Sequence, residues 1–297
     1  MVVTGRAGAL YKGSQKILRI GQTMPRLATP AFFDPDPLGA PVIGVAGQLS
    51  EHDSTSHRHR MAQILFAARG CVALLLGTQQ SYCMLPPTRA AWIPAGVPHR
   101  TRIVHSVEYR SVWFEPSDFP GMPREPRILP VSALLSSLLD LMAAAPISTD
   151  WHTGKPALMA ALALIEISDA GREPMLLPLP NDRRLASLTA DLETLPPTLE
   201  QLAQRVGASV RTIGRIFQRE TGMSYQQWRR QWRLMRAVQL LASGARQGTV
   251  AETLGFAGDS AFITFFRSMT GVTPRRYLDG HAAFDAARRT VSGDIVR

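Results

Sequence analysis

The chain has 297 residues, 45% of them hydrophobic, which is enough apolar material for two domains with separate cores. It carries 33 basic and 23 acidic residues, a formal net charge of +10 that favours an acidic partner such as nucleic acid. There is no run of about 18 apolar residues and no charged-then-apolar leader with a small-residue cleavage site, so we expect a cytoplasmic protein without a membrane span.

The first thirty residues are rich in glycine and basic side chains and show no clear hydrophobic period. We expect residues 1–30 to form a flexible tail, or to precede a second initiation site at Met24. A periodic pattern starts only at Pro41.

Residues 31–125 are predicted to form a small antiparallel β-barrel. Between Pro41 and Glu115, short runs of β-forming residues alternate with glycine, proline and polar turns. The runs are 42–49, 63–67, 71–76, 82–85, 90–93 and 108–114. Cys71 and Cys83 lie in neighbouring predicted strands; buried free thiols are favoured over a redox pair, because disulfides are rare in a reducing cell.

Two histidine-containing motifs lie within this barrel. They are His57-Arg-His59-Arg-Met-Ala-Gln63 with Gly70, and Trp92-Ile-Pro94-Ala-Gly96-Val-Pro-His99. They resemble the two motifs of the cupin barrel, in which two histidines and a glutamate from one strand pair meet a third histidine around a metal. The resemblance places His57, His59 and His99 at the histidine positions and Gln63 at the usual glutamate position. Alternate residues of a strand share a face, so His57 and His59 are expected to point together into the barrel.

Three uses of this histidine group remain open. Imidazoles suit zinc, copper, nickel or iron, but Gln63 removes a charged ligand and so weakens a metal site. Cupin-like sensor domains often hold no metal, which implies a metal-free pocket for a small-molecule effector. The third use is purely structural. We favour the effector pocket and expect neither a catalytic residue nor a cofactor.

Residues 126–172 are predicted to be helical, and residues 173–182, with three prolines, to be a linker. The helical spacing defines two apolar stripes. The first comprises Val131, Leu134, Leu135, Leu138, Leu141 and Met142, and the second Leu158, Met159, Leu162 and Ile165. Packing on the barrel and a homodimer interface explain these stripes equally well.

A helix-turn-helix pattern occupies residues 198–220. Thr198 and Gln201 form a capping box that starts a short helix, and Gly207 ends it in a turn. Ser209 caps a second helix. Its apolar positions are Val210, Ile213, Ile216 and Phe217, and its outer face carries Arg211, Thr212, Gly214, Arg215 and Gln218. A short scaffold helix followed by a basic outward helix is typical of recognition in the major groove of DNA.

The same pattern recurs at residues 248–270. Gly255 ends its first helix, and Asp259 or Ser260 caps the second. The core positions of that helix are Phe262, Phe265, Phe266 and Met269, and its outer face carries Asp259, Ser260, Ala261, Ile263 and Thr264. Thr273 and Pro274 are predicted to open a last short helix that ends near Tyr277.

A single helix is predicted between the two patterns. Ser224 and Gln227 form a capping box, and no glycine or proline interrupts residues 225–242. Such a helix is roughly 27 Å long. It could let two recognition helices enter successive major-groove segments about one helical turn apart.

These segments carry a second resemblance. The strings at 211–224, Gly255-Phe256, Ser260-Ala-Phe262, Phe266-Arg267 and Gly271-Val-Thr-Pro274 with Tyr277 resemble the C-terminal domain of AraC/XylS-type transcription regulators. The resemblance covers about residues 183–280, leaves a tail at 281–297, and implies that both helix-turn-helix units contact DNA.

Three residues depart from the expected pattern or weaken base recognition. Gln247 stands where the family usually has an apolar residue, Gly214 offers no side chain to a base, and Asp259 repels phosphate. The outer face of the first unit carries the arginines, so we expect it to make most of the base contacts and the second unit to contribute positioning.

Charge agrees with DNA as a partner. Residues 204–277 contain twelve arginines, no lysine and three acidic residues, a net charge of +9. The arginine fork binds guanine or phosphate at two points. A further arginine group on the predicted spacer helix, either solvated, internally paired or facing phosphate, comprises Arg229, Arg230, Arg233 and Arg236.

The predicted fold is an α+β multidomain protein, with an N-terminal cupin-like antiparallel barrel and helices and a C-terminal all-α double helix-turn-helix domain. The predicted function is sequence-specific transcription regulation by a homodimer under control of a small-molecule effector, with double-stranded DNA and RNA polymerase as partners. The alternative is a metal-dependent cupin enzyme or metal sensor with a DNA-binding tail. The lack of nearby acid or base groups other than Glu51 and Asp53 argues against an enzyme.

Overall fold

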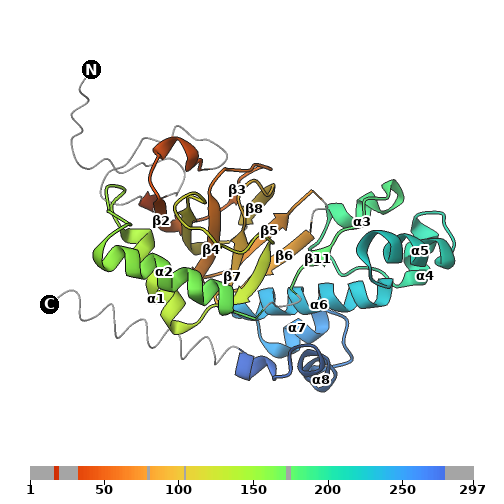
Figure 1. Ribbon diagram of the computed structural model, residues 1–297. Coiled ribbons are helices and arrows are strands. Elements are labelled where there is room, and N and C mark those ends of the chain that lie inside the picture. Colours follow the sequence, from red (N-terminus) through yellow and green to blue (C-terminus); the bar gives the residue numbers. More distant parts are fainter. Residues whose placement is uncertain (1–16, 20–32, 79–80, 104, 172–174, 278–297) are drawn as a thin grey trace. The chain divides into compact units, whose positions relative to one another are not determined.

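The computed structural model describes residues 17–19, 33–78, 81–103, 105–171 and 175–277 (Figure 1). The described residues fall into two compact units, one within residues 17–74 and 85–171 and the other within residues 75–84 and 175–277. We call them the sensor unit and the DNA-binding unit, after the functions that the sequence predicts for them. The two are described separately below.

An antiparallel six-stranded sheet, in the order β1-β2-β9-β4-β7-β10, forms the centre of the sensor unit. Its strands are β1 (Ile17–Arg19), β2 (Val42–Leu49), β4 (Ala62–Arg69), β7 (Arg89–Ile93), β9 (Val107–Phe114) and β10 (Arg127–Pro130). Strand β4 is buried along seven of its eight residues, because both faces of the sheet are covered. This explains why its sequence is almost continuously apolar rather than alternating.

A second sheet contributes β3 (His52–Asp53) and β8 (His99–Ile103) to this unit, paired antiparallel with His52 opposite Ile103. A short 3-10 helix, η1, spans Asp36–Leu38. Two antiparallel sheets in a cupin-like arrangement confirm the predicted fold class. Strand β5 (Val72–Leu76) crosses the boundary between the units, and the expected free thiols are present at Cys71, which is half-buried, and at Cys83, which is buried.

Helices α1 (Ala133–Ala144) and α2 (Gly154–Asp169) pack on the sensor unit, with α1 directly against β2 and β9 (Figure 1). The approach is close: a Cβ added to Gly44 of β2 would lie 2.1 Å from the carbonyl oxygen of Met142. Side chains from the sheet and from both helices share one apolar core, including Ile64, Phe66, Trp92 and Leu139.

The first predicted apolar stripe is buried only in part, since Leu134 and Leu141 are exposed. The second points outward. Leu158, Leu162 and Ile165 are exposed, and α2 instead buries Ala160, Ala163 and Ile167. Small alanine side chains allow α2 to approach its neighbours closely, so the bulkier leucines face outward.

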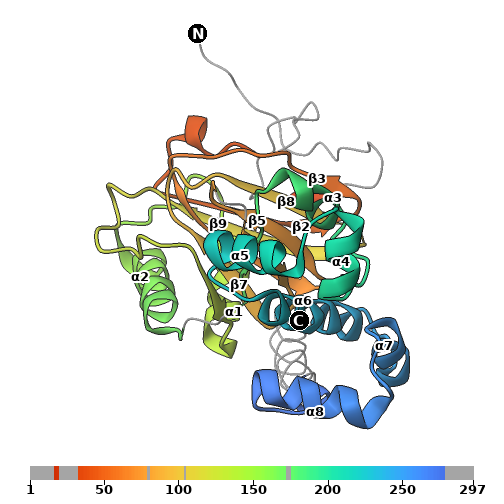
Figure 2. The same cartoon turned by 90° about the vertical axis from the view of Figure 1, so that its right-hand side faces the viewer.

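The described part of the DNA-binding unit is mostly helical (Figure 2). Its elements are β6 (Ser81–Leu85), whose last residue lies beyond the boundary, β11 (Leu177–Pro178), η2 (Arg183–Leu185), α3 (Ala186–Ala190), α4 (Leu199–Arg205), α5 (Val210–Thr221), α6 (Tyr225–Ala242), α7 (Gln247–Thr253) and α8 (Asp259–Thr270). Helices α4 and α5 lie on one side of α6 and α7 and α8 on the other, as both figures show.

The local signals predicted for this unit are present. Both capping boxes, Thr198 with Gln201 and Ser224 with Gln227, are formed, and Ser209 caps α5. Gly207 and Gly255 adopt left-handed backbone conformations, with φ of 64° and 66°, as a glycine turn requires. The spacer helix α6 has the predicted bounds. Residues 274–277 are helical, as predicted after Thr273.

Two details of this unit differ from prediction. The residue that caps α8 is Gly258, at φ 156°, rather than Asp259 or Ser260. Asp259 is the first helical residue, where the positive end of the helix dipole stabilises its negative charge. Val210 is exposed rather than buried, because it is the first residue of α5 and lies outside the core stripe.

Two segment boundaries also differ. The predicted linker 173–182 contains β11, which pairs with β6, and its Met175, Leu177 and Leu179 are buried. Within the predicted tail 1–30, residues 17–19 pair with the edge strand β2, whose unpaired backbone groups accept a further strand. The rest of that tail, and the tail at 281–297, lie outside the described residues.

None of the helices in the described ranges is both long enough and apolar enough to cross a membrane.

Candidate functional site

The histidine-bearing segment 57–61 is held in the sensor unit by backbone hydrogen bonds rather than by a regular strand. His57 and His99 form an isolated antiparallel bridge, in which each backbone N–H donates to the other's carbonyl, at 2.9 and 2.8 Å. The backbone N–H of Gly96 donates to the carbonyl of His59 at 2.9 Å. The carboxylate of Asp36 accepts from the backbone N–H groups of Arg60 and Met61. The prediction that His57 and His59 share one face of a strand is therefore wrong.

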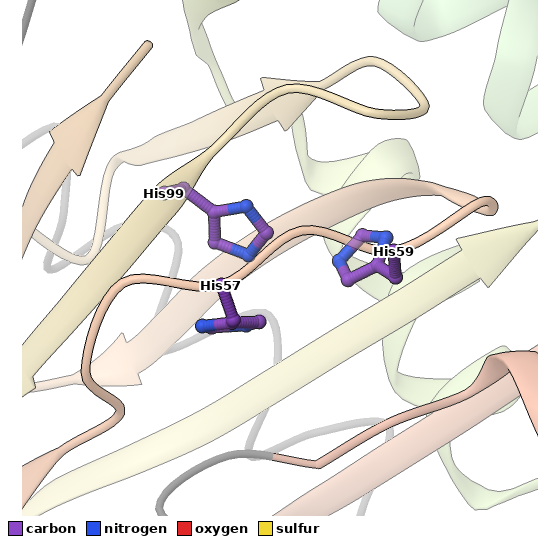
Figure 3. A group of neighbouring side chains, drawn as sticks. All are labelled: His57, His59 and His99. Atoms are coloured by element: carbon purple, nitrogen blue, oxygen red, sulfur yellow. The ribbon is translucent and has the colours of Figure 1, made fainter. Parts of the chain in front are cut away.

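The three histidines nevertheless converge (Figure 3). Their ring centroids lie 4.3 Å apart for His57 and His99, 4.9 Å for His59 and His99, and 6.1 Å for His57 and His59. One nitrogen from each ring lies within 4.8 Å of the others. The structure thus brings the three predicted histidines together.

Each histidine places Nδ1 against a backbone carbonyl. The distances are 3.2 Å from His57 to Thr55 O, 2.5 Å from His59 to Met61 O, and 3.0 Å from His99 to Val97 O. A carbonyl only accepts, so Nδ1 carries the proton and donates. In the neutral imidazole the other nitrogen, Nε2, is then a hydrogen-bond acceptor.

Nε2 of His59 lies among buried side chains that carry polar groups. The indole N–H of Trp113 donates to it at 3.1 Å, and Oε1 of Gln63 lies 3.1 Å from it. The Gln63 amide donates to Oγ of Ser111 at 2.7 Å. The predicted pocket residue Gln63 thus lies beside His59 and is held by Ser111. Hydrogen bonds from Ser111 and Gln63 partly offset the burial that raises the pKa of Tyr109 to about 12.

Burial disfavours the charged form of two of the three rings. Desolvation lowers the pKa of His99 to about 3, against an opposing contribution from its bond to Val97 O. Desolvation also lowers the pKa of His57. With Gln63 in place of a carboxylate, the site presents neutral acceptors and no negative ligand.

The donor set fits a metal ion in part. Imidazoles whose Nδ1–H is bound to a carbonyl are the usual form of histidine ligands. However, His59 already accepts the Trp113 N–H, so a metal would have to displace that bond before it used all three rings. Sequence reasoning missed Trp113, Ser111 and Asp36. The alternation of Tyr109, Ser111 and Trp113 along one strand was the available signal for two of them.

In the DNA-binding unit, α5 presents a basic face. Ile213, Ile216 and Phe217 are buried and hold the helix on its scaffold. Arg211 and Arg215 are exposed, and neither forms an ion pair within the described ranges. The other three predicted contact residues are partly engaged or lack a side chain: Thr212 bonds the Ser209 hydroxyl at 2.9 Å, Gln218 donates to Gly222 O at 3.2 Å, and Gly214 is half-buried.

The outer face of α8 is small and nearly neutral. Ser260, Ala261 and Thr264 are exposed and Ile263 is half-buried. Oδ1 of Asp259 lies 3.5 Å from the position that a Cβ on Gly248 would take, so this carboxylate lies beside the start of α7.

The four spacer-helix arginines make contacts inside the unit. Nε of Arg229 donates to Pro196 O at 2.7 Å, and Arg230 reaches Oγ of Ser268 at 3.5 Å. The guanidinium of Arg233 stacks over Phe256, 5.0 Å from the ring centroid. Arg236 donates to Gln239. Internal contacts therefore account for much of this arginine group.

Comparison with known proteins gives two family matches. Residues 39–174 match the model of the AraC-like ligand binding domain, and residues 202–280 match a helix-turn-helix domain. The chain is 30% identical over 233 residues to the HTH-type transcriptional regulator NimR of Escherichia coli (strain K12), which covers 77% of this chain and 83% of NimR. It is 34% identical over 113 residues to the regulator RipA of Corynebacterium glutamicum, covering 37% of this chain and 34% of RipA. It is 34% identical over 106 residues to the activator RhaS of Escherichia fergusonii, covering 34% of this chain and 38% of RhaS.

Proposed function

This chain belongs to the AraC family of transcription regulators, and from that premise we propose which residues contact DNA and which bind the effector. The protein is a DNA-binding regulator controlled by an effector, as the two family matches and the similarity to NimR show. The observation that carries the proposal is the pair of exposed arginines on α5, Arg211 and Arg215, one helical turn apart and without ion-pair partners in the described part of the chain.

Helix α5 supplies most of the base contacts. Arg211 and Arg215 contact base edges in the major groove, with Thr212, Gly214 and Gln218 at the same face. Helix α8 acts mainly in positioning, because its outer residues are small, apolar or acidic and suit thymine methyl groups or groove shape better than guanine. These residues are Asp259, Ser260, Ala261, Ile263 and Thr264.

The test is a selection of bound sequences from a random DNA pool, followed by affinity measurements at fixed salt. Arg215→Ala should lower the ratio of operator to nonspecific affinity by about 5- to 150-fold, which corresponds to about 1–3 kcal/mol at one base step. The matched control is Arg246→Ala, which removes the same charge from the exposed residue before α7. It should weaken both affinities together. If the Arg215→Ala protein keeps the wild-type ratio of operator to nonspecific affinity, Arg215 does not contact bases.

The effector pocket is lined by His57, His59, Gln63 and His99. Support comes from the convergence of the three rings, one nitrogen of each lying within 4.8 Å of the others, and from the bonds of all three Nδ1 atoms to backbone carbonyls. Such a pocket suits a small ligand that donates hydrogen bonds. Effector binding shifts the equilibrium between arrangements of the DNA-binding units by no more than its difference in affinity for them.

A metal is the second candidate ligand, favoured by the three imidazoles alone. Metal analysis of the purified protein, before and after incubation with Zn²⁺, separates the two. Stoichiometric metal that is lost in the His57→Ala protein would establish a metal site. If the purified protein contains no metal and still binds its operator, an organic effector stays as the candidate ligand of this pocket.

The protein acts as a homodimer in the cytoplasm, where it meets chromosomal DNA and RNA polymerase. Dimerisation is supported by the exposed apolar stripe of α1 and α2, in which Leu158 is 72% and Ile165 54% exposed. A second copy of this chain would bury these side chains, and leucines at this spacing suit helix packing between two identical faces.

A further inference from the structure

The segment 175–182 lies, in sequence, between the ligand-binding family match and the first helix-turn-helix unit. In the structure it belongs to the DNA-binding unit and is fixed on two sides. Its strand β11 pairs antiparallel with β6, with Leu177 opposite Tyr82 and Pro178 opposite Ser81. Strand β6 lies within the sequence range of the ligand-binding match. This segment therefore joins a strand from the sensor part of the sequence to the DNA-binding helices.

The first anchor on the helical side is Trp228 of α6. Its indole N–H donates to the carbonyl of Pro178 at 2.8 Å. The ring is buried and packs against Phe217 of α5, with centroids 5.5 Å apart. Trp228 thus touches both the segment and the core side of the recognition helix.

The second anchor is Glu220, in the last turn of α5. Its Oε2 accepts the backbone N–H groups of Asn181 at 2.9 Å and of Asp182 at 3.0 Å, and its Oε1 accepts from Arg219 at 2.5 Å. Burial by itself raises the pKa of Glu220, but these hydrogen bonds outweigh it and the pKa is lowered. Charge-assisted bonds of this kind are about twice as strong as neutral ones.

We propose that Glu220 is a positioning residue for base recognition, because it fixes α5 to the segment 175–182 and through β11 to β6. Glu220 lies five residues after Arg215 on one uninterrupted helix, so a shift at Glu220 moves both base-contacting arginines. Recognition geometry tolerates only about 0.5 Å. This inference rests on the proposed role of α5 in base contacts.

The test compares Glu220→Ala, Glu220→Gln and Trp228→Phe in the full-length protein, with a selected operator and a nonspecific duplex at fixed salt. Glu220→Ala should lower the affinity ratio about tenfold, whereas Glu220→Gln, which keeps one acceptor oxygen, should restore most of it. Glu193→Ala removes the same charge from an exposed position in this unit and should leave the ratio unchanged. If Glu220→Ala keeps the wild-type ratio of operator to nonspecific affinity, the proposal is overturned. If the wild-type protein itself selects no sequence, the proposed function has failed instead.

A double variant tests whether the two anchors act through the same segment. If they do, Glu220→Ala with Trp228→Phe should lower the ratio little more than the larger single loss, because residues that share a route are non-additive. Fully additive losses overturn the shared route. Hydrogen exchange gives the reciprocal measurement: operator binding should slow exchange of the amides at 181 and 182 in the wild type and not in Glu220→Ala. Unchanged exchange at both amides in the wild type also overturns it.

Discussion

Trp113 donates its indole N–H to Nε2 of His59, with 3.1 Å between the two nitrogens. Nε2 of a neutral imidazole offers one lone pair, so this bond requires the proton to be on Nδ1, where Met61 O accepts it. Both side chains are buried. The pair therefore fixes the orientation of the histidine that lies beside Gln63.

Removing this bond should destabilise the sensor unit. In Trp113→Phe, Nε2 of His59 loses a buried hydrogen bond, which costs about 1–3 kcal/mol beyond the change in packing. Trp151→Phe is the matched control, because Trp151 is equally buried but its indole N–H has no hydrogen-bond partner among the residues that the structure describes. Chemical denaturation of both variants measures the difference. Equal losses in the two proteins would mean that the Trp113 bond contributes nothing to stability.

The fold was predictable where the sequence pattern reports one local interaction. Capping boxes and glycine turns depend only on neighbouring residues, so the bounds of α6 and the caps at Thr198, Ser209 and Ser224 followed from the sequence. Strand β8 was missed because it alternates His99, Thr101 and Ile103 inward with Arg100 and Arg102 outward. A strand whose buried face is partly polar lacks the hydrophobic alternation that identifies strands.

The candidate pocket was predictable only as a set of histidines. The motifs identified His57, His59 and His99, but the position of His59 depends on Asp36, which lies over twenty residues away, and on Trp113 from another strand. Such contacts depend on tertiary folding and leave no local pattern. The sequence also did not indicate which face of α2 packs inward. Both faces are apolar, and only tertiary packing decides that the alanines face inward.

The exposed stripe on α2 should hold the homodimer together. Leu158→Glu combined with Ile165→Glu places two charges on that face, so we expect monomers by sedimentation or light scattering and weaker operator binding. His105→Glu, which adds a charge at an exposed loop position of the sensor unit, should leave the dimer intact. If the doubly substituted protein sediments as the wild type does, the dimer forms elsewhere or the protein is a monomer.

The ion pair between Asp182 and Arg184 predicts a pH dependence for the DNA-binding unit. The hydrogen bond from the Arg184 side chain lowers the pKa of Asp182 from 3.8 to about 2. A lowered pKa means that the carboxylate stabilises the fold above pH 3.8 and that this contribution is lost as the pH falls toward 2. Because the Arg184 side chain is 49% exposed and water screens the pair, we expect Asp182→Asn to cost at most about 1 kcal/mol at neutral pH. Chemical denaturation of the wild type and of Asp182→Asn, at neutral pH and near pH 2, measures this contribution. The difference in stability between the two proteins should shrink in acid.

Gly214 offers a test that separates helix stability from DNA contact. It lies in the middle of α5 at ordinary helical backbone angles, and a Cβ placed on it meets no atom within 4 Å. Gly214→Ala should therefore raise the free energy of unfolding by about 0.5–1 kcal/mol, since alanine loses less backbone entropy on forming a helix. If Gly214 also lets α5 lie close to the bases, the added methyl group must lower operator affinity while nonspecific affinity stays constant. We expect both changes in one protein. A gain in stability with unchanged operator affinity would remove Gly214 from the contact surface and leave base recognition to Arg211 and Arg215.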